Sequence, residues 1–122
     1  TPRDIEMCVM DCLQDDVMEN MAALLRVLNG ADDRRSWESA RGQSFSESEV
    51  QSALVRLMNN GFVIPLAEQA SSNDKISPVQ VSEVGFGVTW SRAWFHLTQA
   101  GRTALQAWWH AEGQARYPVD EM

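Results

Sequence analysis

The chain has 122 residues, 44% of them hydrophobic and 22% charged, with a formal net charge of −7 at pH 7. This composition is typical of one globular domain with a sizeable core, and it excludes a disordered or low-complexity chain. No run approaches the roughly 20 apolar residues of a membrane span. The acidic beginning lacks the layout of a signal peptide, so we expect a cytoplasmic protein.

The first 30 residues predict one long helix, with Asp4 as its N-cap and Asn29-Gly30 as its end. Residues 1–33 hold eight of the 17 acidic residues but two of the ten basic ones, so most of the excess negative charge lies here. The apolar stripe of this helix is broader than one small domain can cover, and we expect a second copy of the chain to pack on it. The predicted homodimer interface, which includes part of the last helix, consists of Val9, Leu13, Val17, Met21, Leu25, Trp108 and Trp109.

Cys8 and Cys12 are the two cysteines of the chain, one helical turn apart. A disulfide across a single turn would need distorted geometry, and zinc would need further ligands, for which there are only the distant His96 and His110. Both cysteines are therefore predicted to be reduced, buried side chains. We expect no metal ion and no cofactor.

Residues 31–61 predict two helices joined by a tight turn. The first runs from Asp32 or Asp33 to Ala40 and ends at Gly42, and the second begins after Ser44 or Ser46. Its inward stripe consists of Val50, Ala53, Leu54, Leu57 and Met58. This arrangement is typical of a helix-turn-helix.

The remaining chain alternates between extended and helical patterns. Phe62-Val63-Ile64 begins a strand, a turn-rich polar loop follows, and the alternating hydrophobic residues of 78–90 indicate extended structure. Residues 93–97 predict a returning strand. Thr98 caps a last helix over 99–115, in which Gly101 permits a close approach of helix to strand. Arg102 can pair with an acidic group in a structural role or reach a phosphate of a ligand.

Two stretches, "SESEVQSALVRLMNNGFV" (46–63) and "WFHLTQAGRTAL" (94–105), occur in this order. The first resembles the recognition helix and following strand of the winged helix-turn-helix family, in the style of the MarR-like and PadR-like bacterial regulators. The second resembles the end of their wing, aromatic-x-Leu-Thr-x-x-Gly-Arg-x-x-Leu. The resemblance covers 31–106 and implies a mainly α fold with a small β-hairpin, a winged helix-turn-helix with flanking N- and C-terminal helices. The single domain would comprise an N-terminal helix (1–30), helix-turn-helix and extended wing (31–98), and a C-terminal helix (99–115).

The resemblance implies that the helix after Ser46 reads double-stranded DNA. Screening limits the field of the acidic first helix to about 8 Å at physiological salt, so on the far side of the domain it need not repel phosphates. Gln51 is suited to pair with adenine, and Glu47 to accept a hydrogen bond from cytosine. The candidate DNA-binding residues are Arg34, Arg35, Arg41, Ser46, Glu47, Ser48, Gln51, Ser52, Lys75 and Arg92.

Two functions remain open. The first is a DNA-binding transcriptional regulator; the second is a winged-helix module that binds no DNA and docks a protein through its acidic first helix or its long wing. A run of carboxylates on a helix is typical of a solvated face, and neither histidine has a nucleophile nearby in the sequence. We therefore expect no catalytic activity.

Overall fold

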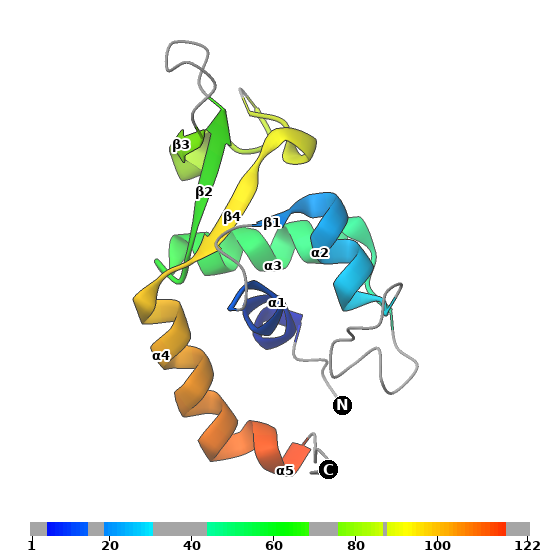
Figure 1. Ribbon diagram of the computed structural model, residues 1–122, viewed down its shortest axis with the longest axis vertical. Helices are drawn as coiled ribbons and strands as arrows, with labels where there is room; N and C mark the ends of the chain where they lie inside the picture. The colour runs from blue at the N-terminus through cyan, green and yellow to red at the C-terminus, as the bar shows by residue number, and fades with distance from the viewer. Residues whose placement is uncertain (1–4, 15–18, 31–43, 69–75, 87, 117–122) are drawn as a thin grey trace.

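The computed structural model describes residues 5–14, 19–30, 44–68, 76–86 and 88–116. A four-stranded antiparallel sheet lies above three helices, and a fourth long helix descends from the end of the sheet (Figure 1). The helices are α1 (Ile5–Leu13), α2 (Met21–Leu28), α3 (Glu47–Asn59), α4 (Gln99–Trp108) and α5 (Gln114–Arg116). The strands are β1 (Glu19–Asn20), β2 (Val63–Glu68), β3 (Ile76–Pro78) and β4 (Trp94–Leu97), with short 3-10 turns η2 (Val81–Glu83) and η3 (Trp90–Arg92) and a π-helical turn η4 (Trp109–Gly113).

The first 30 residues do not form one helix, and that prediction is wrong. α1 ends at Leu13, and Glu19 and Asn20 pair with Phe95 and Trp94 of β4. Asn20 then caps α2, its Oδ1 accepting a hydrogen bond from the Ala23 amide at 2.9 Å. The side-chain periodicity runs on through this break because both helices bury a face in the same core. The predicted helix over 32–40, with Trp37, lies outside the described residues.

The sheet has the order β1-β4-β2-β3. Phe95, in β4, stands opposite Glu19 on one side and Pro65 on the other. The sheet is thus larger than the small hairpin expected from the sequence, since β1 extends it at one edge. Three helices, a short strand between the first two, and a hairpin after the third are compatible with a winged helix.

Residues 78–90 are less extended than predicted. β3 ends at Pro78, and the chain then forms η2, a tight turn at Gly85 (φ 91°) and η3. The ring of Trp90 lies against Gly85 and, with ring centroids 6.0 Å apart, against Phe95. The hydrophobic residues therefore bend the chain back onto the core instead of forming a long strand.

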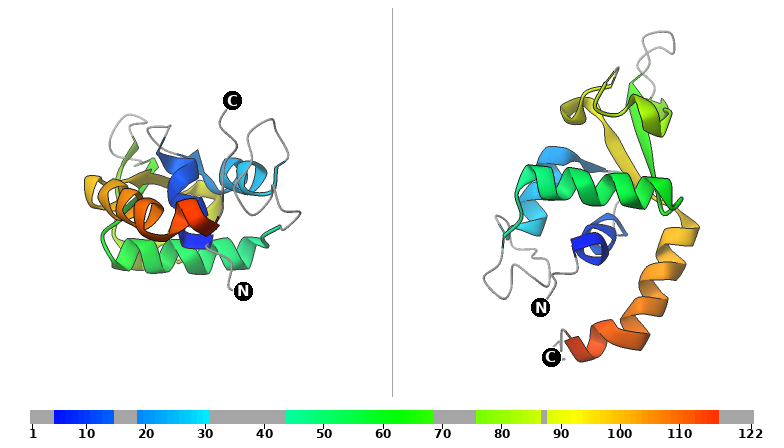
Figure 2. Two further views of the ribbon diagram at one scale, coloured as in Figure 1. Left: turned by 90° about the horizontal axis from the view of Figure 1, so that it is seen from below. Right: turned by 180° about the vertical axis from the view of Figure 1, so that it is seen from behind.

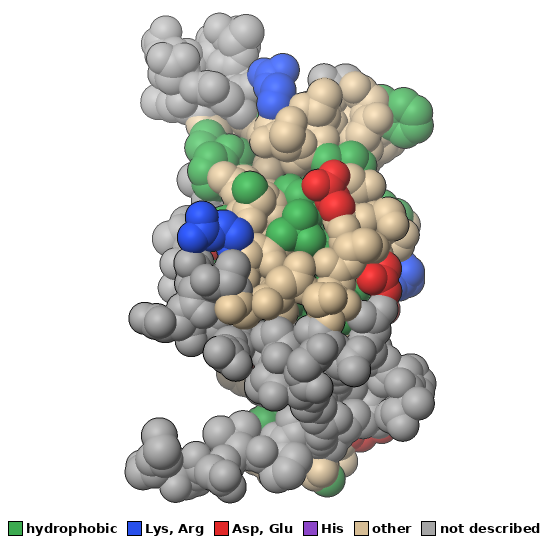
Figure 3. Space-filling view, turned by 90° about the vertical axis from the view of Figure 1, so that its right-hand side faces the viewer, with side chains coloured by type: hydrophobic (Ala, Val, Ile, Leu, Met, Phe, Trp, Pro, Cys, Tyr) green, Lys and Arg blue, Asp and Glu red, His purple; other side chains and the backbone are tan. Residues whose placement is uncertain are grey.

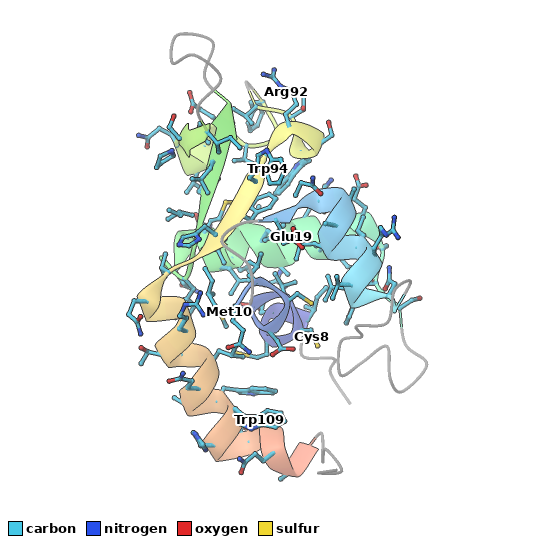
Figure 4. The ribbon with its side chains drawn as sticks, viewed as in Figure 1. Cys8, Met10, Glu19, Arg92, Trp94 and Trp109 are labelled. Carbon is cyan, nitrogen blue, oxygen red and sulfur yellow. The ribbon has the colours of Figure 1, made fainter. Side chains whose placement is uncertain are left out.

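The core lies between the sheet and α1, α2 and α3. Cys8 and Met10 point into it (Figure 4). Both cysteines are buried and form no disulfide, as predicted. Val9 and Leu13 are 0% exposed and Met21 is 3% exposed. The prediction that these three form a dimer interface is wrong, because they fill the core of one chain and leave no surface for a second. Val17 lies outside the described residues.

The junction of β4 with α4 confirms two predictions. The Thr98 side chain accepts a hydrogen bond from the Gly101 amide at 3.0 Å and so caps α4. A Cβ on Gly101 would lie 2.4 Å from the Phe62 carbonyl oxygen, so the helix approaches the start of β2 at a distance that no side chain allows. Arg102 has a structural role, but its acceptor is a backbone carbonyl and not the predicted acidic group. It donates to the Gln14 carbonyl oxygen at 2.9 Å and ties α4 to the end of α1.

Candidate nucleic-acid interface

α3 begins at a strongly defined position. The side chain of Ser46 accepts a hydrogen bond from the Glu49 amide at 3.2 Å, and the Ser46 amide donates to the Glu49 carboxylate at 2.9 Å. This reciprocal pair is a capping box, and it selects Ser46 over Ser44 as the cap. The exposed Ser46 is thereby a structural cap of the helix, its hydroxyl facing the helix amides.

A single side chain ties the entry of α3 to the end of α2. Asn29, the C-cap of α2, accepts from the Phe45 amide at 2.7 Å and donates to the Phe45 carbonyl at 3.0 Å. The amide group thus pairs with Phe45 as a neighbouring β-strand would. Phe45 is itself 4% exposed, so this contact fixes the start of α3 relative to the core.

Asn29→Ala is expected to lower the free energy of unfolding by about 1–2 kcal/mol, because two hydrogen bonds are lost together. Asn29→Asp keeps the shape but sets a carboxylate oxygen against the Phe45 carbonyl, and should destabilise at least as much. Asn60→Ala, at the exposed C-cap of α3, is the matched control and should change stability by less. Urea unfolding followed by tryptophan fluorescence measures the stability of all three variants. Equal losses of stability in Asn29→Ala and Asn60→Ala would show that the hydrogen bonds between Asn29 and Phe45 do not join α2 to α3.

The solvent face of α3 is uncharged along its middle. Ser48, Ser52 and Asn59 are exposed, Val55 is 38% exposed and Gln51 is half-buried. The predicted inward stripe is confirmed, since all five of its residues are buried. Three of these solvent-facing residues are predicted candidates, whereas Val55 and Asn59 are not. The signal for these two is helical spacing, since Val55 lies four residues after Gln51 and Asn59 seven residues after Ser52.

Glu47 is bound to another candidate residue. The Gln51 side-chain amide donates to its carboxylate at 3.1 Å. An amide –NH₂ has two hydrogens, so Gln51 keeps one N–H and its carbonyl oxygen for another partner. The two side chains therefore form a bonded pair. Glu47 keeps acceptor capacity on its other carboxylate oxygen, and its hydrogen bond to cytosine stays a prediction.

The acidic first helix is adjacent to α3, which corrects the expectation that it lies on the far side. α1 packs against α3 and crosses beneath it (Figures 1 and 2). The Arg56 side chain donates to the Glu6 carboxylate at 3.0 Å. Ile5 lines a hollow of about 390 Å³ together with Ser48, Glu49, Ser52 and Arg56. One early carboxylate thus neutralises the one arginine of α3.

Positive charge is sparse on the described part of this end of the molecule. The face at the start of α3 shows scattered blue side chains and no basic patch among the atoms that are coloured (Figure 3). Arg92, in η3, is exposed and points away from the body (Figure 4). Its side chain makes no hydrogen bond or ion pair within the described ranges, so it is available to a phosphate. The other basic candidates, Arg34, Arg35, Arg41 and Lys75, lie outside the described residues.

The remaining dimer candidates are half-buried. Leu25 lines a hollow of about 240 Å³ beside Glu47 and Ser91. Trp108 and Trp109 lie in and after α4 with ring centroids 6.2 Å apart, and a Cβ on Gly113 would lie 2.6 Å from each ring. Trp109 also lines a hollow of about 320 Å³ between α4 and α1, with Asp11, Gln14, Leu105, Gln106 and His110. These residues keep surface that a second molecule could cover.

No protein-family model and no curated protein matches the chain. Among solved structures, the fold is similar to a protein of Thermoplasma acidophilum described as a candidate transcriptional regulator, with a TM-score of 0.58 and 16% sequence identity. The similarity covers 92% of this chain and 82% of the other. The two proteins share a fold. Among the helices that the structure describes, none combines the length and the hydrophobicity of a membrane span.

Proposed function

We propose that this chain is a transcriptional regulator of the winged-helix type, related in style to the MarR-like and PadR-like proteins, and that α3 binds the major groove of double-stranded DNA. One observation carries the proposal. The start of α3 is fixed by its capping box and by the two hydrogen bonds between Asn29 and Phe45. The helix presents a solvent face of Ser48, Gln51, Ser52, Val55 and Asn59. Hydroxyl, amide and small apolar groups are those that contact base edges. The fold shared with a candidate regulator supports the same function.

Phosphate affinity must then come from residues around α3. Arg92 is one candidate, and Arg34, Arg35 and Arg41 precede α3 in the chain. Each phosphate contact adds about 0.9 to the slope of log affinity against log salt. Because the described surface carries few cations, we expect DNA affinity to be low and to depend strongly on each phosphate contact.

The test is a fluorescence polarisation titration of the full chain against a random-sequence DNA duplex, repeated from about 50 to 200 mM salt. We expect binding at the lowest salt. The triple variant Arg34→Ala, Arg35→Ala, Arg41→Ala should reduce the salt slope by up to about 2.7, and Arg92→Ala by about 0.9. Arg116→Ala, at the end of α5, is the control and should leave the slope unchanged. Absence of binding to any duplex at about 50 mM salt would reject the proposal.

A second candidate function is a docking module for a basic protein segment. The first turn of α3 carries Glu47 and Glu49, and Glu6 of α1 lies beside Arg56 in its last turn. Carboxylates at these positions attract cations and repel phosphates. The chain would bind a labelled oligoarginine peptide more tightly than DNA, and Glu6→Gln would weaken that binding. For a DNA-binding protein the same variant frees Arg56 and should strengthen DNA binding, so the two functions predict opposite signs.

Homodimer formation through Leu25, Trp108 and Trp109 completes the proposal. α4 extends beyond the helical body (Figures 1 and 2), which places its last turns where a second copy could meet them. A dimer would present two α3 helices to two half-sites about 34 Å apart. Sedimentation of the full chain and of Trp109→Ala tests this arrangement.

A further inference from the structure

We infer that α3 selects A·T base pairs, with Gln51 reading adenine, Val55 contacting the thymine methyl group and Glu47 positioning Gln51. The inference rests on the proposed function, since it assigns base preference to the same helix. It begins from Val55, which with Phe86 makes up the exposed large hydrophobic residues of the described chain. Val55 stands among polar residues on the solvent face of α3, so an apolar group lies on the surface that the proposed function gives to DNA.

The three residues lie on one ridge of α3. Glu47, Gln51 and Val55 are spaced by four, so each is the surface neighbour of the next. The hydrogen bond from Gln51 to Glu47 at 3.1 Å fixes which end of the amide is the –NH₂, because a carboxylate accepts and does not donate. The amide is therefore held with its second N–H and its carbonyl oxygen unclaimed by Glu47. These are one donor and one acceptor, the pattern that pairs with N7 and N6 of adenine.

The side chains that α3 lacks also bear on its base preference. Guanine is read best by arginine or lysine, and Arg56 is the one such residue in Glu47–Asn59. Its Nε–H is bound to Glu6 at the edge of the face. An exposed apolar side chain one turn from the glutamine matches the 5-methyl group, which only thymine has. Adenine and thymine are thus the bases that this ridge fits.

The first experiment selects bound sequences from a random duplex library with the full chain, and then replaces thymine by deoxyuridine in the selected site. Deoxyuridine lacks the methyl group and keeps the base pair. We expect the wild-type chain to bind the uracil site about fourfold more weakly for each methyl contacted, which is the effect of burying one such carbon. Val55→Ala should bind the two sites equally. Phe86→Ala, which changes the other exposed hydrophobic residue, should retain the wild-type difference.

The second experiment separates reading from positioning. Gln51→Ala should reduce discrimination for adenine over the other bases by about 5- to 150-fold. Glu47→Ala should reduce the same discrimination while overall affinity stays equal or rises, because a carboxylate near the phosphates is removed. A loss of cytosine preference in Glu47→Ala would instead show that Glu47 reads a base, and would overturn its positioning role.

The outcomes distinguish this inference from the proposed function. If no duplex is bound at low salt, both fail. If DNA is bound with the expected salt slope but the selected sites are rich in G·C, or the uracil substitution has no effect, the regulator proposal stands and the A·T selectivity is rejected. Circular dichroism of each variant shows that α3 is intact, and all the substituted side chains are exposed or half-buried.

Discussion

Replacing Phe95 by alanine is expected to lower the free energy of unfolding by about 3–5 kcal/mol. Phe95 is fully buried at the centre of β4, with β1 paired on one side and β2 on the other. Its ring also supports Trp90, against which the turn at Gly85 rests. A cavity at this point removes contacts from the core and from the turn at Gly85 at the same time.

The matched control for Phe95→Ala is Phe86→Ala. Phe86 is 85% exposed, so its truncation should change stability by no more than about 0.5 kcal/mol. Guanidinium unfolding followed by tryptophan fluorescence compares the two, and Phe95→Leu provides a milder change should the alanine variant unfold in buffer. Similar losses in the free energy of unfolding for Phe86→Ala and Phe95→Ala would show that Phe95 is not central to the core.

Replacing Gly101 by valine is expected to cost about 3 kcal/mol or more, and by alanine somewhat less. A helix interior favours alanine over glycine by about 1 kcal/mol, so an unobstructed site would be stabilised. Here the new Cβ would meet the Phe62 carbonyl oxygen at 2.4 Å and a Leu97 methyl carbon at 2.6 Å. A backbone oxygen cannot rotate away, and the amide and the hydroxyl of Thr98 hold the Phe62 oxygen in place by donating to it. Steric overlap therefore outweighs helix propensity.

Gly61→Ala is the control for Gly101. Gly61 has a positive φ of 76°, and no heavy atom lies within 4 Å of the position of a Cβ. Its substitution should cost about 1–2 kcal/mol through backbone strain alone. Thermal unfolding of the three variants gives the order, and a Gly101→Val variant as stable as Gly61→Ala would show that α4 does not pack on β2 as described.

The candidate site was predicted in part from local sequence. The start of α3 has a local signal, because a capping box is made by residues three apart, here Ser46 and Glu49. The start of α4 also has one, since Thr98 caps it by accepting a hydrogen bond from the Gly101 amide. Val55 was missed because a valine on a helix is normally assigned to the core, and its exposure depends on where the surrounding elements lie. Arg102 was open between two roles, since its acceptor is the carbonyl of a residue 88 positions earlier.

Local sequence signals were enough for the elements whose determinants lie within a few residues: the end of α3, its start to within two residues, the Thr98 cap of α4, the buried stripe and the reduced cysteines. The break between α1 and α2 depends on long-range pairing, since Glu19 and Asn20 become a strand by pairing with Phe95 and Trp94, some 75 residues away. The tertiary structure also decided the electrostatics of α3, where Glu6 meets Arg56 across 50 residues. Caps and periodicity are local in the chain, whereas strand pairing and ion pairs depend on which distant segments the core brings together.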